Sequence, residues 1–266
     1  YKCFTKGIMV GKSNGTYSST RKFLPKTKIT RDEAKKMMNR LKNKGKRFKL
    51  SYDGQVLRII NLPKNYKDYP YILASFPNSY YEKKMWYTKQ RTKKDKTPAQ
   101  TAKILSDEDK DMICAKIKKN VELRLNVDYR KTFTSKWKSD LMNTYIDTNK
   151  QKSVNAYIKA AKARKVVVSS GEVIVDPSSL WLREYGTTCY ARVYVKFRVK
   201  SGKIPSAKSK YQNEVIYGSY TGMKNLTSKK TVTFADEIEC DLSYTNGKLT
   251  SYGVDWGGDS IANVNN

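Results

Sequence analysis

Histidine is absent from this 266-residue chain, and acidic residues are scarce beside basic ones. The lack of histidine excludes Ser-His and Cys-His catalytic pairs and every zinc site that uses an imidazole. With 54 Lys and Arg against 24 Asp and Glu, the formal charge is +30. Such a polycation attracts any polyanion, so the charge indicates a class of partner and not its identity.

Cysteine is also sparse, with Cys3, Cys114, Cys189 and Cys240 the only four and no CxxC spacing among them. This count is too low for a disulfide scaffold, so we expect free core thiols. Cys189 and Cys240 are the one pair to consider as a bridge, because both share the inward phase of a predicted strand. We expect no metal and no cofactor.

Long apolar runs are missing too, and none approaches the roughly eighteen residues of a membrane-spanning helix. Aromatic residues, 20 of them Tyr, compensate for the low aliphatic share and predict a globular chain. The chain begins at Tyr1, which predicts a processed chain whose targeting segment is missing.

The charge divides the chain. Residues 1–104 hold 27 Lys and Arg against 6 Asp and Glu, whereas residues 105–266 hold 27 against 18. The basic stretch from Lys89 to Pro98 has no apolar period and is typical of a linker. We therefore predict a basic region at 1–88, a linker at 89–104 and a second domain at 105–266.

One helix is clear in the first region. Thr30 and Glu33 form a capping box, and an apolar stripe of Ala34, Met37, Met38 and Leu41 follows at helical spacing. We expect this helix to stop at Gly45. A strand is predicted at 56–60, and the Tyr-rich segment 62–87 is expected to pack against the second domain.

The second domain reads as helices followed by strands. Ser106 caps a helix with the stripe Ile113, Ile117, Val121 and Leu125, and two shorter helices carry Trp137 and Tyr157. Strands are predicted at 166–175, 189–200, 215–220 and 231–244, with an Asn246-Gly247 hairpin. This order predicts an α+β fold with helices on one face of a curved antiparallel sheet.

Strict alternation marks the strand 189–200. Residues from Cys189 to Val199 at odd positions are mostly apolar, whereas the even positions are Tyr, Arg and Lys. The period of two predicts one buried face and one wet, basic face. The acids Glu237, Glu239 and Asp241 fall on the corresponding wet face of the last strand, where we expect them to pair with Lys196 and Arg198.

Residues 7–44 carry a recognisable pattern: Gly-Ile-Met-Val-Gly-Lys-Ser-Asn-Gly-Thr-Tyr from Gly7, then Ile-Thr-Arg-Asp-Glu-Ala from Ile29. This resembles one repeat of the S-layer homology module, although Asn14 stands where that family has Asp and the family's anchors usually combine three repeats. The resemblance implies a secreted protein that binds an anionic polymer of a Gram-positive cell wall. The polymer-binding residues it implies are Arg31, Gly15, Thr16, Thr30 and Glu33.

The second domain resembles, through its element order, the cystatin-like or nuclear-transport-factor-2-like cone. Such a fold fixes no activity. Asp236 is in phase with the inward face of its strand, where it could be a pocket acid, but a β-bulge that turns it to water is favoured. Trp181 and Tyr194, with Tyr185 and Tyr190, could line a sugar-stacking surface or simply pack in a core.

These observations predict a non-catalytic cell-envelope protein at the cell wall or cell surface. Its basic first region would bind anionic wall polysaccharide or teichoic-type polymer, and its α+β domain would bind a ligand or protein. Two alternatives stay open: a nucleic-acid-binding protein, since basic runs flank Tyr-rich sequence, and a carbohydrate-processing enzyme with a carboxylate pair near Asp236.

Overall fold

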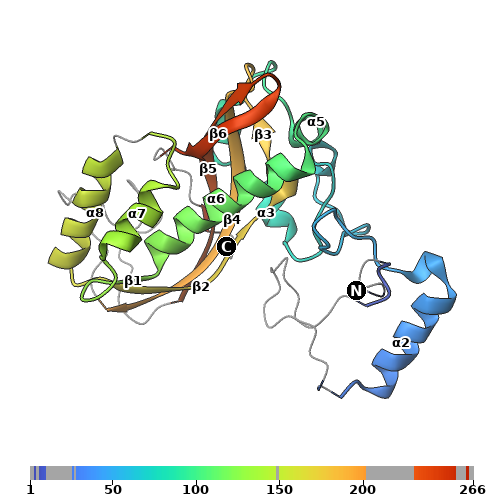
Figure 1. Cartoon of the computed structure of the whole chain (residues 1–266). Helices are drawn as coiled ribbons and strands as arrows, with labels where there is room; N and C mark the ends of the chain where they lie inside the picture. The colour runs from blue at the N-terminus through green and yellow to red at the C-terminus, as the bar shows by residue number, and fades with distance from the viewer. Residues whose placement is uncertain are drawn as a thin grey trace. The chain divides into compact units, whose positions relative to one another are not determined.

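The computed structural model describes residues 3, 6–9, 26, 28–147, 150–201, 231–255 and 262–263. The chain forms two compact units, Tyr1–Glu82 and Lys83–Asn266, which are described separately below (Figure 1). The division falls at Lys83, ahead of the predicted linker 89–104. That stretch contains a helix, α5 (Pro98–Ile104), whose Thr101 is fully buried.

The first unit contains the predicted helix, α2 (Arg31–Lys42). It begins at the predicted capping box and ends with Asn43 as its C-cap, two residues before Gly45. Arg47 closes its far end, because the guanidinium donates to the carbonyls of Arg40 and Leu41. None of the twelve described residues of α2 is buried. The apolar stripe of this helix is therefore largely exposed, with Met38 and Leu41 about half accessible.

The core of the first unit is a cluster of aromatic side chains. Phe76 stacks on Tyr80 with ring centroids 4.2 Å apart, and Tyr81 meets Tyr69 edge-on at 5.0 Å. Tyr80 and Tyr81 of this cluster belong to the short helix α3 (Asn78–Glu82). The first unit also contains two short turns, η1 (Lys44–Lys46) after α2 and η2 (Tyr66–Asp68) before Tyr69.

The predicted strand at 56–60 is wrong. Val56 and Leu57 form only isolated bridges, with Leu50 and Leu73 respectively. Ile59 and Ile60 point into solvent instead of continuing the pairing.

The second unit is α+β, as predicted, and its antiparallel sheet curls around a core (Figure 1). The strand order is β1-β2-β4-β5-β6, with β3 paired to β4 and β7 to β5. The strands are β1 (Val127–Asp128), β2 (Val167–Val175), β3 (Trp181–Leu182), β4 (Thr188–Ser201), β5 (Thr231–Thr245), β6 (Lys248–Val254) and β7 (Ala262–Asn263). The predicted strand 215–220 lies outside the described residues.

Helix α6 (Asp107–Leu125) lies across one face of the sheet (Figure 1). Ser106 caps it by accepting a hydrogen bond from the Asp109 amide, and the predicted stripe from Ile113 to Leu125 is fully buried. The remaining elements are α4 (Trp86–Gln90), α7 (Ser135–Met142), α8 (Gln151–Ala163) and the turn η4 (Pro177–Ser179). No described helix is both long and apolar enough to cross a bilayer.

Strand β4 confirms the predicted alternation over only half its length. Lys196, Arg198 and Lys200 are exposed, so this end has one wet, basic face. At the other end, Tyr190, Arg192 and Tyr194 are all buried. The expectation of a wet face there is wrong, because Tyr87 packs on Tyr190, and Lys83 and Thr88 contact the Arg192 guanidinium.

The pairing between β4 and β5 runs in one register from Thr188↔Asp241 to Arg198↔Thr231. No bulge interrupts it at Asp236, which pairs with Val193, so the favoured bulge is wrong; the side chain of Asp236 lies outside the described ones. Cys189 and Cys240 are directly opposite each other, and both are free and buried.

The predicted Asn246-Gly247 hairpin joins β5 to β6. Both residues have positive φ, 51° and 75°, as the tight two-residue turn requires.

Candidate functional site

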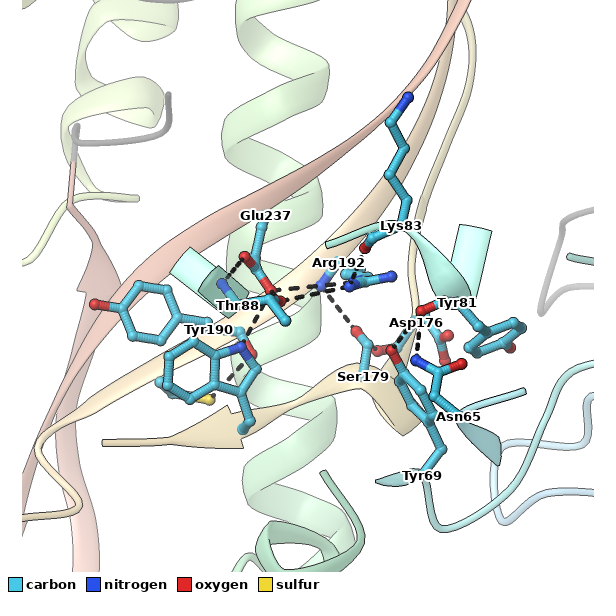
Figure 2. A network of polar contacts seen from close by, with 12 residues as sticks. Asn65, Tyr69, Tyr81, Lys83, Thr88, Asp176, Ser179, Tyr190, Arg192 and Glu237 are labelled. Atoms are coloured by element: carbon cyan, nitrogen blue, oxygen red, sulfur yellow. Dashed lines mark hydrogen bonds and ion pairs between the residues drawn. The ribbon is translucent and has the colours of Figure 1, made fainter. Parts of the chain in front are cut away.

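The most distinctive polar group in the second unit is a buried pair of opposite charges, Arg192 on β4 and Glu237 on β5. The register places them directly opposite each other, and their side chains are 3% and 1% exposed. Figure 2 shows Glu237, Arg192 and Thr88 turned toward one another. The Arg192 Nε and Glu237 Oε1 atoms are 4.0 Å apart, so the ion pair is loose and hydrogen bonds to other groups complete it.

The Glu237 carboxylate accepts hydrogen bonds on both oxygens. The Thr88 amide donates to Oε2 at 2.8 Å, and the Thr88 hydroxyl donates to Oε1 at 2.5 Å. The indole N–H of Trp181 donates to Oε1 at 3.1 Å. Thr88 lies in α4 and is 149 residues away in sequence, so the carboxylate joins a distant segment to the sheet. A carboxylate satisfied in this way can stay buried without a large net cost.

Arg192 holds the same segment from the other side. Its guanidinium donates to the Lys83 carbonyl at 2.7 Å and lies 3.4 Å from the Thr88 hydroxyl. Its backbone amide donates to the Ser179 hydroxyl at 2.8 Å, and that hydroxyl in turn donates to the Asp176 carbonyl. The contacts of Arg192 and Glu237 thus tie residues 83–88 and the η4 turn to one face of the sheet. We call this set of contacts the clasp.

An aromatic stack lies beside the clasp. Tyr190 has Trp181 on one side at a centroid distance of 4.3 Å and Tyr87 at 4.6 Å. Arg183 donates from Nε to the Tyr190 hydroxyl. Burial raises the pKa of Tyr190 to about 12, because the charged phenolate would lose its hydration in this position.

A second set of acids continues along β5 next to this stack. Burial raises the pKa of both Glu239 and Asp241, and the charge of Asp255 acts in the same direction. Asp255 itself forms an ion pair with Lys150 at 2.7 Å. Within the described residues, no group of three or more Cys, Asp or Glu side chains is arranged to hold a metal ion.

The clasp is suited to holding structure together rather than to chemistry. A general acid or base needs an exchangeable proton within reach of a substrate, whereas Glu237 is fully buried and occupied by Thr88 and Trp181. The same burial prevents Trp181 and Tyr190 from stacking on a sugar.

Two of the three residues of the predicted pocket, Trp181 and Tyr194, have described side chains. Trp181 and Tyr194 are buried on the face that carries the clasp, since Trp181 pairs with Tyr190 and both Tyr190 and Tyr194 alternate with core residues of β4. Position 236 is in phase with Ile238 and Cys240, which face α6. Of the four aromatic residues considered for a sugar surface, only Tyr185 is exposed, at 83%.

The predicted polymer-binding residues on α2 are partly described. The Glu33 carboxylate accepts from the Thr30 amide at 2.8 Å, and the Thr30 hydroxyl accepts from the Glu33 amide at 3.2 Å, which confirms the capping box. Arg31 is exposed at the first position of the helix. Gly15 and Thr16 lie outside the described residues.

Sequence reasoning missed the clasp. Alternation assigns Arg192 and Glu237 to a wet face, because each alternates with apolar neighbours. The expected pairing of Glu237 with Lys196 or Arg198 is wrong, since the register places it opposite Arg192. One signal was available: aligning the apolar residues of these two strands in an antiparallel pair allows only a few registers, and one of them places Arg192 opposite Glu237.

No protein-family model, curated protein or solved structure matches this chain.

Proposed function

We propose that this chain is a non-catalytic protein of the cell envelope whose first unit binds an anionic polymer of the cell wall. The observation that carries the proposal is the exposed start of α2, where Arg31 stands at the positive end of a helix that has no buried residue among those described. A cation at this end opposes the helix dipole, Asp32 and Glu33 in the same turn offset part of that repulsion, and a bound anion would relieve the rest.

The capping box prepares the start of α2 for an anion. Thr30 and Glu33 occupy each other's amides, which fixes the first turn without using the amides of Arg31 and Asp32. Those two amides point along the helix axis, as the N–H groups of any first turn do. A carboxylate or phosphate of a polymer could accept from them together with the Arg31 guanidinium.

A row of cations extends from this point along the helix. With about 3.6 residues per turn, Arg31, Lys35 and Lys42 fall on the same side of α2. All three are exposed. A linear polymer with repeated negative charges would therefore meet several cations in succession, so its binding should weaken as salt increases.

The second unit, in this proposal, is an accessory cystatin-like or nuclear-transport-factor-2-like domain that binds a ligand or a protein. The support for a non-catalytic role is the clasp, where the buried carboxylate Glu237 is used for structure. A location outside the cell, at the wall or surface, follows from the polymer that the first unit would bind.

Co-sedimentation with purified Gram-positive cell walls tests the proposal. The walls are used intact and after chemical removal of their secondary polymers, at low and high salt. We expect binding to intact walls only, and Arg31→Ala should weaken it about fivefold or more, as for the loss of one charge-assisted contact. Lys36→Ala is the matched control, because it removes one exposed cation from another side of the same helix.

The opposite result is equally clear. If the stripped walls bind as well as intact walls, or if the two variants lose the same affinity, then binding depends on net charge and the proposal fails.

A nucleic acid is the second candidate ligand, favoured by the exposed row Lys196, Arg198 and Lys200 on β4. Competition with RNA separates the two candidates. Two results together would favour the nucleic acid: RNA displaces the wild type and Arg31→Ala equally from walls, and Arg198→Ala binds RNA more weakly than the wild type does.

A further inference from the structure

Two consecutive isoleucines in the first unit are the most exposed large aliphatic side chains in the described part of the chain. Ile59 is 62% accessible and Ile60 is 71% accessible. Single exposed apolar residues are ordinary, but two adjacent ones at a loop tip form a point at which a protein can enter an apolar medium.

Hydrogen bonds hold the loop that carries these residues at both of its ends. Before the tip, the Arg58 guanidinium donates to the Asn78 side chain at 2.7 Å and to the Phe76 carbonyl at 2.5 Å. After the tip, the Lys64 amide donates to the Glu82 carboxylate, and the Asn65 side chain donates to the Tyr81 carbonyl. Both ends are thus fixed to the aromatic core of the first unit.

The turn that follows the isoleucines has a constrained backbone. Asn61, which follows them, has a φ of +50°, the left-handed region that few residues other than glycine, asparagine and aspartate enter readily. Pro63 is buried and begins the return of the chain toward the core. The sequence Ile-Ile-Asn-Leu-Pro therefore presents two branched apolar side chains at the end of a constrained turn.

The positive charge around the tip indicates which kind of surface the two isoleucines would enter. Lys64 and Lys67 are exposed beside it, and residues 1–82 hold 19 Lys and Arg against 5 Asp and Glu. Two copies of so basic a unit repel each other, which disfavours a second copy as the occupant. A surface that is apolar inside and negatively charged outside complements both features, and an anionic lipid bilayer is such a surface.

We propose that the loop from Arg58 to Lys67 is a peripheral membrane-binding tip, in which Ile59 and Ile60 enter the interface of an anionic bilayer while Lys64 and Lys67 contact lipid headgroups. The proposal does not depend on polymer binding by α2, because the two surfaces use different residues. It adds a second attachment to the envelope, which acts by insertion and not only by charge.

Sedimentation with vesicles tests this tip. The full chain is mixed with vesicles of phosphatidylcholine alone or of phosphatidylcholine and phosphatidylglycerol. We expect binding to the anionic vesicles, a loss of about tenfold or more for Ile59→Ser/Ile60→Ser and a comparable loss for Lys64→Ala/Lys67→Ala. Ile104→Ser is the control, since Ile104 is similarly exposed, at 57%, in another unit.

A second variant tests insertion through a fluorescence signal that appears on binding, so the test does not depend only on variants that lose binding. Ile60→Trp should show a blue shift of its emission, relative to wild type, when anionic vesicles are added, because the indole enters the interface. Circular dichroism spectra of all variants should match the wild type, and the serine variant should keep its binding to cell walls.

Three outcomes would overturn the proposal. These are equal binding of the serine double variant, equal binding to neutral and anionic vesicles, and a wild-type dimer that the serine double variant converts to a monomer. The first would leave electrostatic attraction alone, and the last would assign the tip to a second copy of the chain.

Discussion

Two helices of this chain begin with the same chemistry in different surroundings. At α2 the Thr30 and Glu33 groups exchange hydrogen bonds of 2.8 and 3.2 Å, and at α5 Thr97 and Gln100 do so at 2.9 and 3.2 Å. Yet none of the described residues of α2 is buried, whereas α5 buries Pro98 and Thr101. A capping box thus fixes where a helix starts, and contacts elsewhere in the chain decide what the helix contributes to stability.

The same contrast separates the two units. In the second unit, apolar side chains fill the space between α6 and the sheet, and the clasp with its aromatic stack fills the other face. In the first unit, the described core is the small aromatic cluster around Tyr81, and the largest helix stands outside it. We therefore expect substitutions of equal chemistry to differ in effect according to the unit in which they are made.

The largest effect is expected for Glu237→Ala. This change leaves the Arg192 guanidinium buried without the carboxylate that faces it, which should cost about 3–5 kcal/mol of unfolding free energy. Urea denaturation followed by tryptophan fluorescence measures it. Replacing both members, Arg192→Leu/Glu237→Leu, should cost less than Glu237→Ala alone. A loss below about 1 kcal/mol for the single change would show that the clasp does not stabilise the unit.

A smaller loss is expected for Thr101→Val in α5. The Thr101 hydroxyl is fully buried and accepts a hydrogen bond from the Leu182 amide, which valine cannot replace. The orphaned amide should cost about 1–3 kcal/mol, seen as a lower midpoint of urea unfolding. Thr97→Ser, which keeps the cap of the same helix, serves as a control and should unfold like the wild type.

The two capping boxes allow a direct comparison. Thr97→Ala and Thr30→Ala each remove one N-cap, worth about 1 kcal/mol. We expect Thr97→Ala to lower the stability of the whole second unit, since α5 belongs to that unit and buries Pro98 and Thr101 within it. Thr30→Ala should instead speed amide hydrogen exchange within α2 and leave global unfolding unchanged. Equal shifts in global unfolding for both variants would contradict the contrast drawn between the two helices.

The smallest effect concerns Glu239. Burial raises its pKa above the usual 4.5, so the ionised form is disfavoured in the folded state. The contribution of Glu239 to stability is fully present below the pKa that it has in the unfolded chain. It is lost as the pH rises through the higher pKa that it has in the folded protein. Glu239→Gln should remove that dependence and raise unfolding free energy near neutral pH by about a few tenths of a kcal/mol, since the group is only partly buried. Thermal unfolding of both proteins from pH 4 to 8 measures this dependence. A wild-type stability that rises with pH relative to Glu239→Gln would contradict the prediction.

Local patterns predicted much of the second unit. The cap at Ser106, the stripe from Ile113 to Leu125 and the hairpin at Asn246-Gly247 all depend on residues close in sequence, and each is present. Alternation along β4 and at Ile238, Cys240 and Leu242 of β5 also predicted correctly which side chains lie in the core that α6 covers. Tyr244, in the same phase of β5, is 39% exposed beyond a shift of register.

The clasp could not be predicted in this way. Alternation separates the two faces of a strand but says nothing about what covers the second face, and here the cover comes from Thr88, far from Glu237 in sequence. The strand predicted at 56–60 failed for a related reason: β-branched residues favour extended backbone, yet a strand also needs a partner, and Ile59 and Ile60 have none among the described pairings.

The clasp also sets the shortest piece of the chain that can be produced as a separate second unit. A gene fragment that begins at residue 105, where the predicted domain starts, would omit Thr88, Tyr87 and α5. Trp181 and Tyr190 would then meet water, and a recombinant product of this kind would tend to aggregate. A fragment that begins at Lys83 retains every contact of the clasp and is the one to express.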